Sequence, residues 1–236
     1  MRVKSLFILI FFSASTVFSL AQDPIKVAPE SYRVQFENDL VRVLRVHYAV
    51  RSKVPVHDHS RYPAAYVYLN DAGPVRFSHT DWEHPVLTRP PVKARSFRLS
   101  PTTADAETHS VENSGDSSSD FLRIEFKSLK QGRDLAHRRF PPELISVGKA
   151  FNKIHFENDH VRVSCLVSAG SSLALPAEHE PSLIAVISPA GITGEALQGP
   201  AAKPGQTVWI KGGERATLES ADGRQLEVLR FEIKKR

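Results

Sequence analysis

An eight-residue segment occurs twice in this chain, and this repeat constrains the fold more than any other feature. FENDLVRV at residues 36–43 recurs as FENDHVRV at residues 156–163, with seven of the eight positions identical. The ends of the two copies also match, as FLRIEFK (121–127) and VLRFEIK (228–234). Copies of about one hundred residues are far longer than solenoid repeats. We therefore interpret them as two related domains.

Each copy has the pattern of several short β-strands. Apolar and polar residues partly alternate in DLVRVLRVHYAV, AAYVYLN, PVRFSH, KARSFRLS and FLRIEFK, which turn-forming Gly, Pro, Asn and Asp separate. The second copy repeats this style in HVRVSCLV, SLIAVIS, TVWIKG and LEVLRFEI. Many short strands with turn signals predict an all-β fold of barrels or sandwiches. We expect domains at 32–128 and 153–236, with a connector at 129–152 that could hold a short helix ending before Pro141.

The amino-terminal segment 1–21 has the features of a signal peptide. Two basic residues precede an apolar run at 6–12, and Ser19 and Ala21 have the small-residue spacing that a signal peptidase prefers. The apolar run is short for a membrane span. We expect cleavage near Gln22, export to the periplasm or the medium, and no stable membrane span in the mature chain.

Charge and cysteine content argue against a nucleic-acid-binding protein and against a protein held together by disulfides. Without residues 1–21 the chain has 29 basic and 26 acidic residues, a net charge of +3. This excess is mild, and the most basic local run, 127–139, is better explained by a solvated connector than by binding to nucleic acid. The single cysteine, Cys165, rules out an intrachain disulfide, and its strand-like surroundings favour packing as a small apolar group.

Two closely spaced histidines mark a candidate metal site. His57 and His59 are separated by one residue in VPVHDH, just before an apolar, aromatic segment. Residues i and i+2 of a strand share one face, so both imidazoles could meet one metal ion. His109 is the candidate for a third ligand. The alternative is a pair of surface histidines, because the His-x-His spacing alone is common.

These residues resemble the signature of the cupin superfamily. Cupin motif 1 has the form G-x5-H-x-H-x(3,4)-E-x6-G, and His57-Asp58-His59 matches its two histidines. Motif 2 has the form G-x5-P-x-G-x2-H-x3-N, and His109 with Asn113 matches its end. The chain is similar to two-domain (bicupin) proteins of a bacterial exported group without an assigned function. The resemblance implies two tandem jelly-roll barrels, also called double-stranded β-helices, and one divalent metal bound by His57, His59 and His109.

The chain also departs from both motifs. Pro63 and Ala64 stand where motif 1 has its glutamate, and Arg51 stands where it has its first glycine. In motif 2, the glycine, proline and glycine positions are occupied by Arg98, Ala104 and Ala106. The missing glutamate weakens the case for a four-ligand site, although three-histidine cupin sites also support oxygenation.

The second copy keeps the complementary half of motif 2. Gly205 and Gly213 match its two glycines, but Ala216 and Ser220 replace the histidine and the asparagine. Its counterpart of motif 1 retains only His179. We therefore expect no similar metal site in the second domain.

Several further residues are candidates for ligands or for the wall of a pocket. Glu107 lies two residues before His109 and would share its face, either as a fourth ligand or as a solvent-facing residue. His79 and His84 are interpreted as loop histidines, and Asp58 as an exposed residue or a partner of a ligand. Candidates for the pocket wall are Arg45, His47, Tyr66 and Tyr68, the first two by analogy with the apolar Cys165 and Val167.

The sequence leaves the function open between three classes. The first is a dioxygenase- or isomerase-like metalloenzyme acting on a small molecule, with Fe, Mn, Ni, Cu or Zn as the metal. The second is a non-catalytic barrel that binds or senses a small ligand. The third is a structural exported protein, which predicts no bound metal. A homodimer is compatible with each class.

Overall fold

Both copies of the repeat fold into β-sandwich barrels. A computed structural model describes residues 22–80, 83–101, 108–130, 133–188, 192–193 and 203–234. The segment 1–21 and Glu107 lie outside these residues. Within them, the only helix is the short α1 (Pro24–Val27), and no helix is long and apolar enough to cross a membrane. The predicted all-β fold is confirmed.

The first barrel consists of two sheets. The six-stranded sheet has the order β1 (Tyr32–Glu37), β2 (Val41–Tyr48), β9 (Ser119–Phe126), β4 (Ala64–Tyr68), β7 (Phe97–Ser100) and β10 (Arg138–Phe140). The four-stranded sheet has the order β3 (Lys53–Asp58), β8 (Thr108–Asn113), β5 (Val75–His79) and β6 (Val86–Arg89). From β2 to β9 the chain crosses repeatedly between the sheets, and neighbouring strands are antiparallel. This is a jelly roll.

The second barrel repeats this arrangement with fewer strands. Its five-stranded sheet has the order β11 (Phe151–Glu157), β12 (Val161–Val167), β18 (Glu227–Ile233), β14 (Ser182–Val186) and β16 (Thr207–Ile210). Its three-stranded sheet has the order β13 (Ser172–Leu175), β17 (Ala216–Ser220) and β15 (Ile192–Thr193). Both copies have a bulge at the same place, between Val34 and Phe36 and between Ile154 and Phe156.

The repeated sequence segment forms a hairpin turn together with the hydrogen bonds that stabilise it. The side-chain oxygens of Asn38 and Asn158 each accept backbone N–H groups from residues two and three positions later, all at 2.9 Å. Lys127 and Lys234, at the ends of the matching carboxyl-terminal segments, donate to the carbonyl oxygens of these asparagines at 2.9 and 2.7 Å. The matching segments are therefore in contact within each copy, because together they hold the turn between the first two strands.

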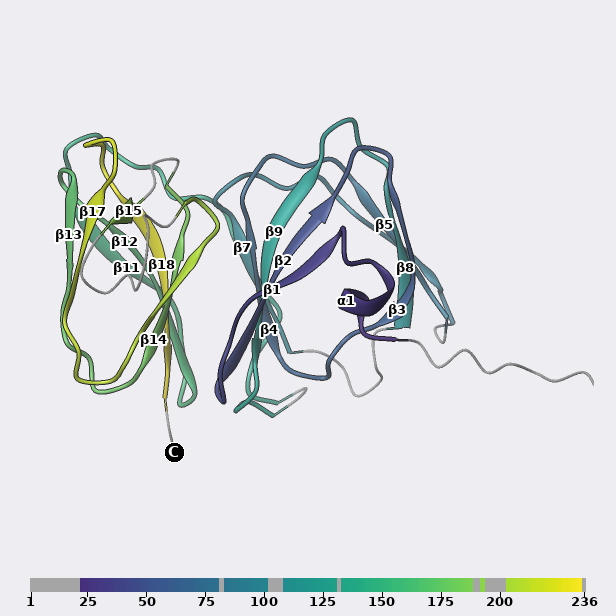
Figure 1. Ribbon diagram of the computed structural model, residues 1–236, viewed down its shortest axis with the longest axis horizontal. Coiled ribbons are helices and arrows are strands. Elements are labelled where there is room, and N and C mark those ends of the chain that lie inside the picture. Colours follow the sequence, from purple (N-terminus) through teal and green to yellow (C-terminus); the bar gives the residue numbers. More distant parts are fainter. Residues whose placement is uncertain are drawn as a thin grey trace, which may run out of the picture.

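The large sheets of the two barrels face each other and enclose the main core. Figure 1 shows the barrels side by side, with β4, β7 and β9 of the first toward β14 and β18 of the second. Residues of both barrels, such as Phe126 and Phe231, form one buried cluster, with these two rings 6.1 Å apart. Two further clusters fill the interiors of the individual barrels.

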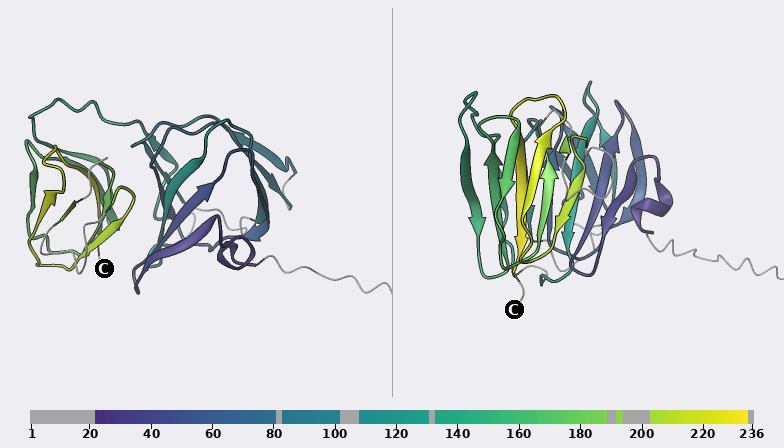
Figure 2. Two further views of the ribbon diagram at one scale, coloured as in Figure 1. Left: turned by 45° about the horizontal axis from the view of Figure 1, so that its top comes forward. Right: turned by 60° about the vertical axis from the view of Figure 1, so that its left-hand side comes forward.

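The connector departs from the expected short helix. Arg138–Phe140 instead form β10, which pairs with β7 at the edge of the six-stranded sheet. The Phe140 ring stacks on that of Phe97 at 4.4 Å, so pairing with a free strand edge and aromatic contact outweigh local helix formation. Beyond β10 the chain crosses to the second barrel, as Figure 2 shows.

Candidate metal centre

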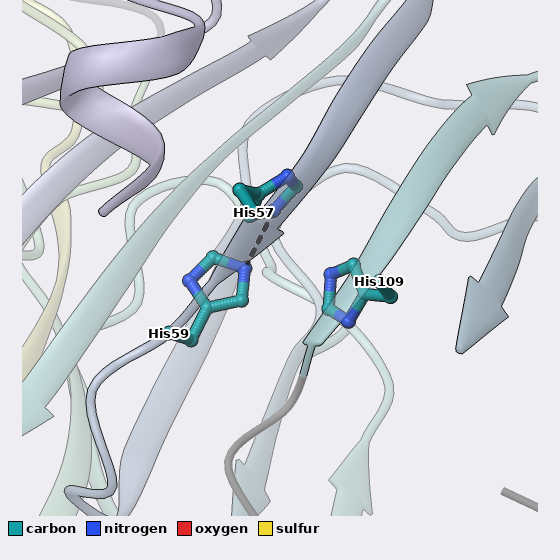
Figure 3. Close-up of side chains that lie close together, drawn as sticks. All are labelled: His57, His59 and His109. Carbon is teal, nitrogen blue, oxygen red and sulfur yellow. Dashed lines mark hydrogen bonds between the residues drawn. The ribbon is translucent and has the colours of Figure 1, made fainter. Parts of the chain in front are cut away.

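The strand register brings His57, His59 and His109 together inside the first barrel. His57 on β3 and His109 on β8 are directly opposite in the antiparallel pair, so their side chains are neighbours on one face. His59 follows the end of β3 by one residue, and Figure 3 shows its ring turned toward the other two. The three residues are buried, with exposed fractions of 0%, 6% and 1%. They point into the barrel.

The spacing of the ring nitrogens fits one metal ion. One ligand atom from each histidine lies within 4.8 Å of the others. The Nε2 atoms of His57 and His59 are 3.1 Å apart. Two nitrogens that each bind a metal at about 2.1 Å, at angles between a right angle and tetrahedral, lie about 3.0–3.4 Å apart. This pair therefore has the separation of adjacent ligands.

Hydrogen bonding supports the same assignment. Nδ1 of His57 lies 2.8 Å from the carbonyl oxygen of Pro55, which can only accept, so Nδ1 carries the proton and Nε2 offers its lone pair to the cluster. Among the described residues, Nδ1 of His59 and both nitrogens of His109 are buried with no hydrogen-bond partner. An unsatisfied buried polar atom costs about 1–3 kcal/mol. A bound metal would remove part of that cost, so the three histidines fit a metal ion.

Burial also sets the protonation state that ligation needs. It lowers the pKa of His57 and lowers the pKa values of His59 and His109 well below their ordinary value. The positive charge of Arg123 adds to the effect for all three. The imidazoles are therefore neutral near pH 7, which is the form that binds a metal.

Comparison with solved structures identifies the fold. The bacterial pirin YhhW from Escherichia coli in complex with nickel(II) aligns over 87% of this chain and 91% of its own, with 14% identity and a TM-score of 0.57. A cupin 2 conserved barrel domain protein from Leptotrichia buccalis aligns over 86% and 88%, with 11% identity and a TM-score of 0.51. An oxalate decarboxylase mutant from Bacillus subtilis aligns over 90% and 72%, with 10% identity and a TM-score of 0.51.

This chain has the cupin fold. No family model and no curated protein sequence matches it. The alignments cover most of the chain, so they include both barrels and not the histidine-bearing one alone. The resemblance drawn from the two motifs is confirmed at the level of fold.

The cupin barrel that carries the histidines also carries buried tyrosines that the sequence did not single out. The Tyr32 hydroxyl lies 3.1 Å from Nε2 of His57 and 2.6 Å from the Tyr48 hydroxyl. Burial raises the pKa values of both tyrosines, so both hydroxyls stay protonated near neutral pH. Tyr48 shares a strand face with the interior residues Leu44 and Val46, but both faces of this strand carry apolar residues, so the sequence does not show that this face looks inward.

Arginines line the same cavity and were also missed. Arg123 on β9 is almost fully buried, and it donates to the Tyr66 hydroxyl at 2.8 Å and to Glu125 at 2.9 Å. A small cavity beside the histidines is lined by Tyr32, Tyr48, Tyr66, Phe77, Arg89 and Arg123. The sequence shows these arginines in ordinary strand alternation, so it carries no signal that they are buried.

The two tyrosines proposed for the pocket wall lie in the interior, but the two residues proposed on β2 do not. Tyr66 belongs to the inner cluster of the first barrel, and the partly buried Tyr68 packs against it. Arg45 forms an ion pair with Asp120 at 3.8 Å and extends toward Pro204 of the second barrel, while the exposed His47 contacts Asp120 at 2.9 Å. The expectation for Arg45 and His47 is therefore wrong.

The expectation for Arg45 and His47 failed because their counterparts in the second copy are buried between the barrels. Cys165 and Val167 are buried as expected, but in the cluster between the barrels and not inside the second one. On β2, Val41 and Val43 belong to that cluster, and Arg45 and His47 continue the same odd-numbered face. The counterparts are buried on the strand face that meets the other barrel, so the analogy did not place Arg45 and His47 inside the first barrel.

His79 is a buried strand residue and not the expected loop histidine. It ends β5 directly opposite His109, and the two rings are 5.0 Å apart and nearly perpendicular. Its nitrogens do not belong to the group within 4.8 Å. His84 is exposed, as expected for a loop. Asp58 is half-buried, and its N–H donates to the carbonyl oxygen of Gln22 at 3.0 Å.

The second barrel offers no comparable cluster within the described residues. Its inner hydrophobic cluster consists of aliphatic residues, including Ala216 on β17 at the motif 2 histidine position. The His179 side chain is 97% exposed. Gly205 and Gly213 keep φ values of +80° and +81°, which favour glycine, so the motif 2 turns persist without its ligand.

Proposed function

We propose that this cupin holds one divalent transition metal through His57, His59 and His109 and acts as a metalloenzyme on a small molecule. The observation that carries the proposal is the buried cluster, whose nitrogens have ligand spacing and, in His59 and His109, lack hydrogen-bond partners among the described residues. Three imidazoles suit Fe, Mn, Ni, Cu or Zn and leave coordination positions open.

The reaction class that fits is dioxygenase-like or isomerase-like. A metal held by three histidines supplies a Lewis acid with positions for a substrate oxygen or for O2. The chain's own residues orient the ligands, exclude water with aromatic walls and present the Tyr32 hydroxyl as a hydrogen-bond donor beside His57. The Tyr48 hydroxyl, 2.6 Å from that of Tyr32, holds it in place.

The second candidate is a non-catalytic barrel that binds or senses a small ligand. One observation favours it: among the described residues around the cavity, the buried carboxylate is Glu125, which is engaged with Arg123 at 2.9 Å. A general base of the usual carboxylate type is therefore not evident in that part of the chain.

Metal analysis followed by oxygen uptake separates the candidates. The purified full-length protein should contain close to one transition metal per chain by elemental analysis. Oxygen-consumption assays with thiols, phenols and diketones then test the enzyme. Bound metal without turnover of any substrate class supports the binding module, and the absence of metal after reconstitution rejects the metalloenzyme.

We also propose that the mature protein is exported and begins near Gln22. The proposal rests on the basic, apolar and small-residue pattern of residues 1–21. Amino-terminal sequencing of protein from the native host should find this end. Soluble protein that retains Met1 would reject the proposal.

A further inference from the structure

Two buried tyrosine hydroxyls form a short chain of hydrogen bonds that ends on a histidine of the cluster. The Tyr48 hydroxyl lies 2.6 Å from that of Tyr32, which in turn lies 3.1 Å from Nε2 of His57. Both tyrosines are buried, and within the described part of the chain neither hydroxyl has a further hydrogen-bond partner. Each hydroxyl therefore depends on the partners within this short chain.

Both hydroxyl protons have an acceptor as long as no metal is bound to His57. Nδ1 of His57 donates to the carbonyl oxygen of Pro55, so Nε2 of the same ring is an acceptor. Tyr48 can donate to the Tyr32 oxygen, and Tyr32 can donate to this Nε2. Two O–H protons thus meet two acceptors.

A metal ion on His57 would leave one of these protons without an acceptor. An imidazole nitrogen has a single lone pair, and the bond to the metal uses it. The two hydroxyls can still bond to each other, but that bond accommodates only one of the two protons. A buried donor without an acceptor is costly. The missing acceptor must therefore come with whatever binds next to the metal.

Space for that acceptor lies beside the Tyr32 hydroxyl and the histidines. A hollow of about 10 Å³, the inner hollow, has Tyr32, Tyr48, His59 and His109 in its wall. A volume of this size holds a single water. The adjoining hollow, which shares Tyr48 and Phe77 with it, has about 30 Å³. The inner hollow therefore fits the ligating atom of a small molecule and not the molecule's whole body.

Backbone contacts hold Tyr32 in this position. Tyr32 is the first residue of β1 and lies opposite Val46 of β2, and its N–H donates to the carbonyl oxygen of Ala28 at 3.0 Å. Its ring meets those of His57 and His59 at centroid distances of 5.2 and 5.7 Å. The hydroxyl is thus preorganised, so a ligand gains its hydrogen bond without first ordering a side chain.

We propose that the coordination position beside Tyr32 takes a small molecule that ligates through an anionic oxygen, and that the Tyr32 hydroxyl selects this ligand by donating to that oxygen. An anionic oxygen keeps further lone pairs after it binds a metal, whereas the nitrogen of an amine keeps none. A hydrogen bond to a charged acceptor is also stronger than one to a neutral group. This inference rests on the proposed function, because it requires a metal on the three histidines.

The test uses the cobalt(II)-loaded full-length chain with azide as the probe, a small anion whose bound nitrogen keeps a lone pair. Cobalt absorption in the visible range gives the azide affinity, and the infrared stretch of bound azide reports a hydrogen bond to it. Tyr32→Phe should weaken azide binding about ten-fold or more, the equivalent of one hydrogen bond to a charged group. It should also shift the stretch, while cobalt stays near one per chain.

Two further tyrosine variants separate donation by Tyr32 from a structural effect. Tyr48→Phe should keep most of the azide affinity, because Tyr32 retains its proton. Tyr62→Phe is the matched control, since this tyrosine of the first barrel is 38% exposed and outside the wall of the inner hollow. Its azide affinity and azide stretch should equal those of the native chain.

Three results would overturn the inference. The first is an unchanged azide affinity in cobalt-loaded Tyr32→Phe, and the second is an equal loss of affinity in Tyr48→Phe. The third is an ultraviolet phenolate band that appears on cobalt loading of the native chain and is missing from Tyr32→Phe, because Tyr32 would then be a ligand itself. If Tyr32→Phe does not hold cobalt, the native chain decides: the azide stretch should shift on transfer to D2O, and no shift would reject the hydrogen bond.

Failure of the metal site is distinguishable from failure of this inference. A native chain that takes up no cobalt rejects the proposed function and this inference with it. A native chain that holds one cobalt but binds no azide, or binds it equally well without the Tyr32 hydroxyl, rejects the inference alone.

Discussion

At the scale of residues, the position of each histidine decides its chemistry. His57, His59 and His109 are buried, neutral and mutually close, whereas His179 is on the surface of the second barrel. Removing one of three ligands should lower metal affinity severely, because two imidazoles chelate far less strongly than three. The loss of an exposed histidine should cost nothing.

The first prediction follows for metal content. His57→Ala and His109→Ala should reduce the metal measured by elemental analysis toward zero, and His179→Ala should retain about one ion per chain. Circular dichroism of each variant controls for folding. Two ions per native chain, or retention in His109→Ala, would place the site elsewhere.

A second prediction concerns His79, the buried neighbour of His109. Its ring packs against those of His109 and Phe77 at centroid distances of 5.0 and 6.5 Å, and its nitrogens are outside the close group. His79→Phe should therefore keep the packing and retain about one metal per chain. Metal content near zero in a folded His79→Phe variant would make His79 a fourth ligand.

At the scale of elements, the repeated hairpin shows why one sequence segment recurs. The asparagine side chain satisfies two backbone N–H groups of the turn, and a lysine from the last strand of the barrel donates to that asparagine's carbonyl oxygen. The same set of bonds recurs around Asn158. The bonds need a side-chain oxygen at this distance from the backbone, which asparagine supplies in both copies.

The third prediction tests that hairpin. Asn38→Ala should lower the free energy of unfolding by about 1–2 kcal/mol, because two hydrogen bonds to backbone N–H groups are lost. Asp39→Ala, one residue later and exposed, should change it by less than about 0.5 kcal/mol. Urea unfolding measures both. Equal effects of the two substitutions would show that the asparagine bonds contribute little.

At the scale of the whole molecule, the two barrels share a core. The cluster between the large sheets contains aliphatic and aromatic residues from both copies, and the buried Glu227 of β18 accepts from Arg95 of the first barrel at 2.5 and 3.0 Å. The second barrel has an aliphatic inner cluster and covers one face of the histidine-bearing barrel. It packs against the outer face of that barrel's large sheet.

The fourth prediction is that damage to this core spreads to both barrels. Phe126→Ala, on β9 beside Phe231, should cost about 3–5 kcal/mol through lost burial and a cavity. Hydrogen–deuterium exchange should quicken in β14 and β18 as well as in β9. Val56→Ala, on an exposed position of β3, should leave exchange unchanged. Faster exchange confined to the first barrel would contradict a shared core.

The sequence by itself determined the all-β class, the twofold repeat and the candidate ligand pair of His57 and His59. These features depend on local rules: alternation, turn residues and the i, i+2 spacing of His57 and His59. His109 was reached only through resemblance to a motif, because register between distant strands is not a local property.

Only the tertiary structure decided which face of each strand looks into the cavity. Both faces of β2 carry apolar residues, since Val41 and Val43 meet the second barrel while Leu44 and Val46 meet the interior. Alternation could therefore not tell the inward face from the outward one. The burial of His79, Arg98 and Arg123 was hidden for the same reason. A polar side chain is buried by the neighbours that folding brings to it, and those neighbours come from strands far away in the chain.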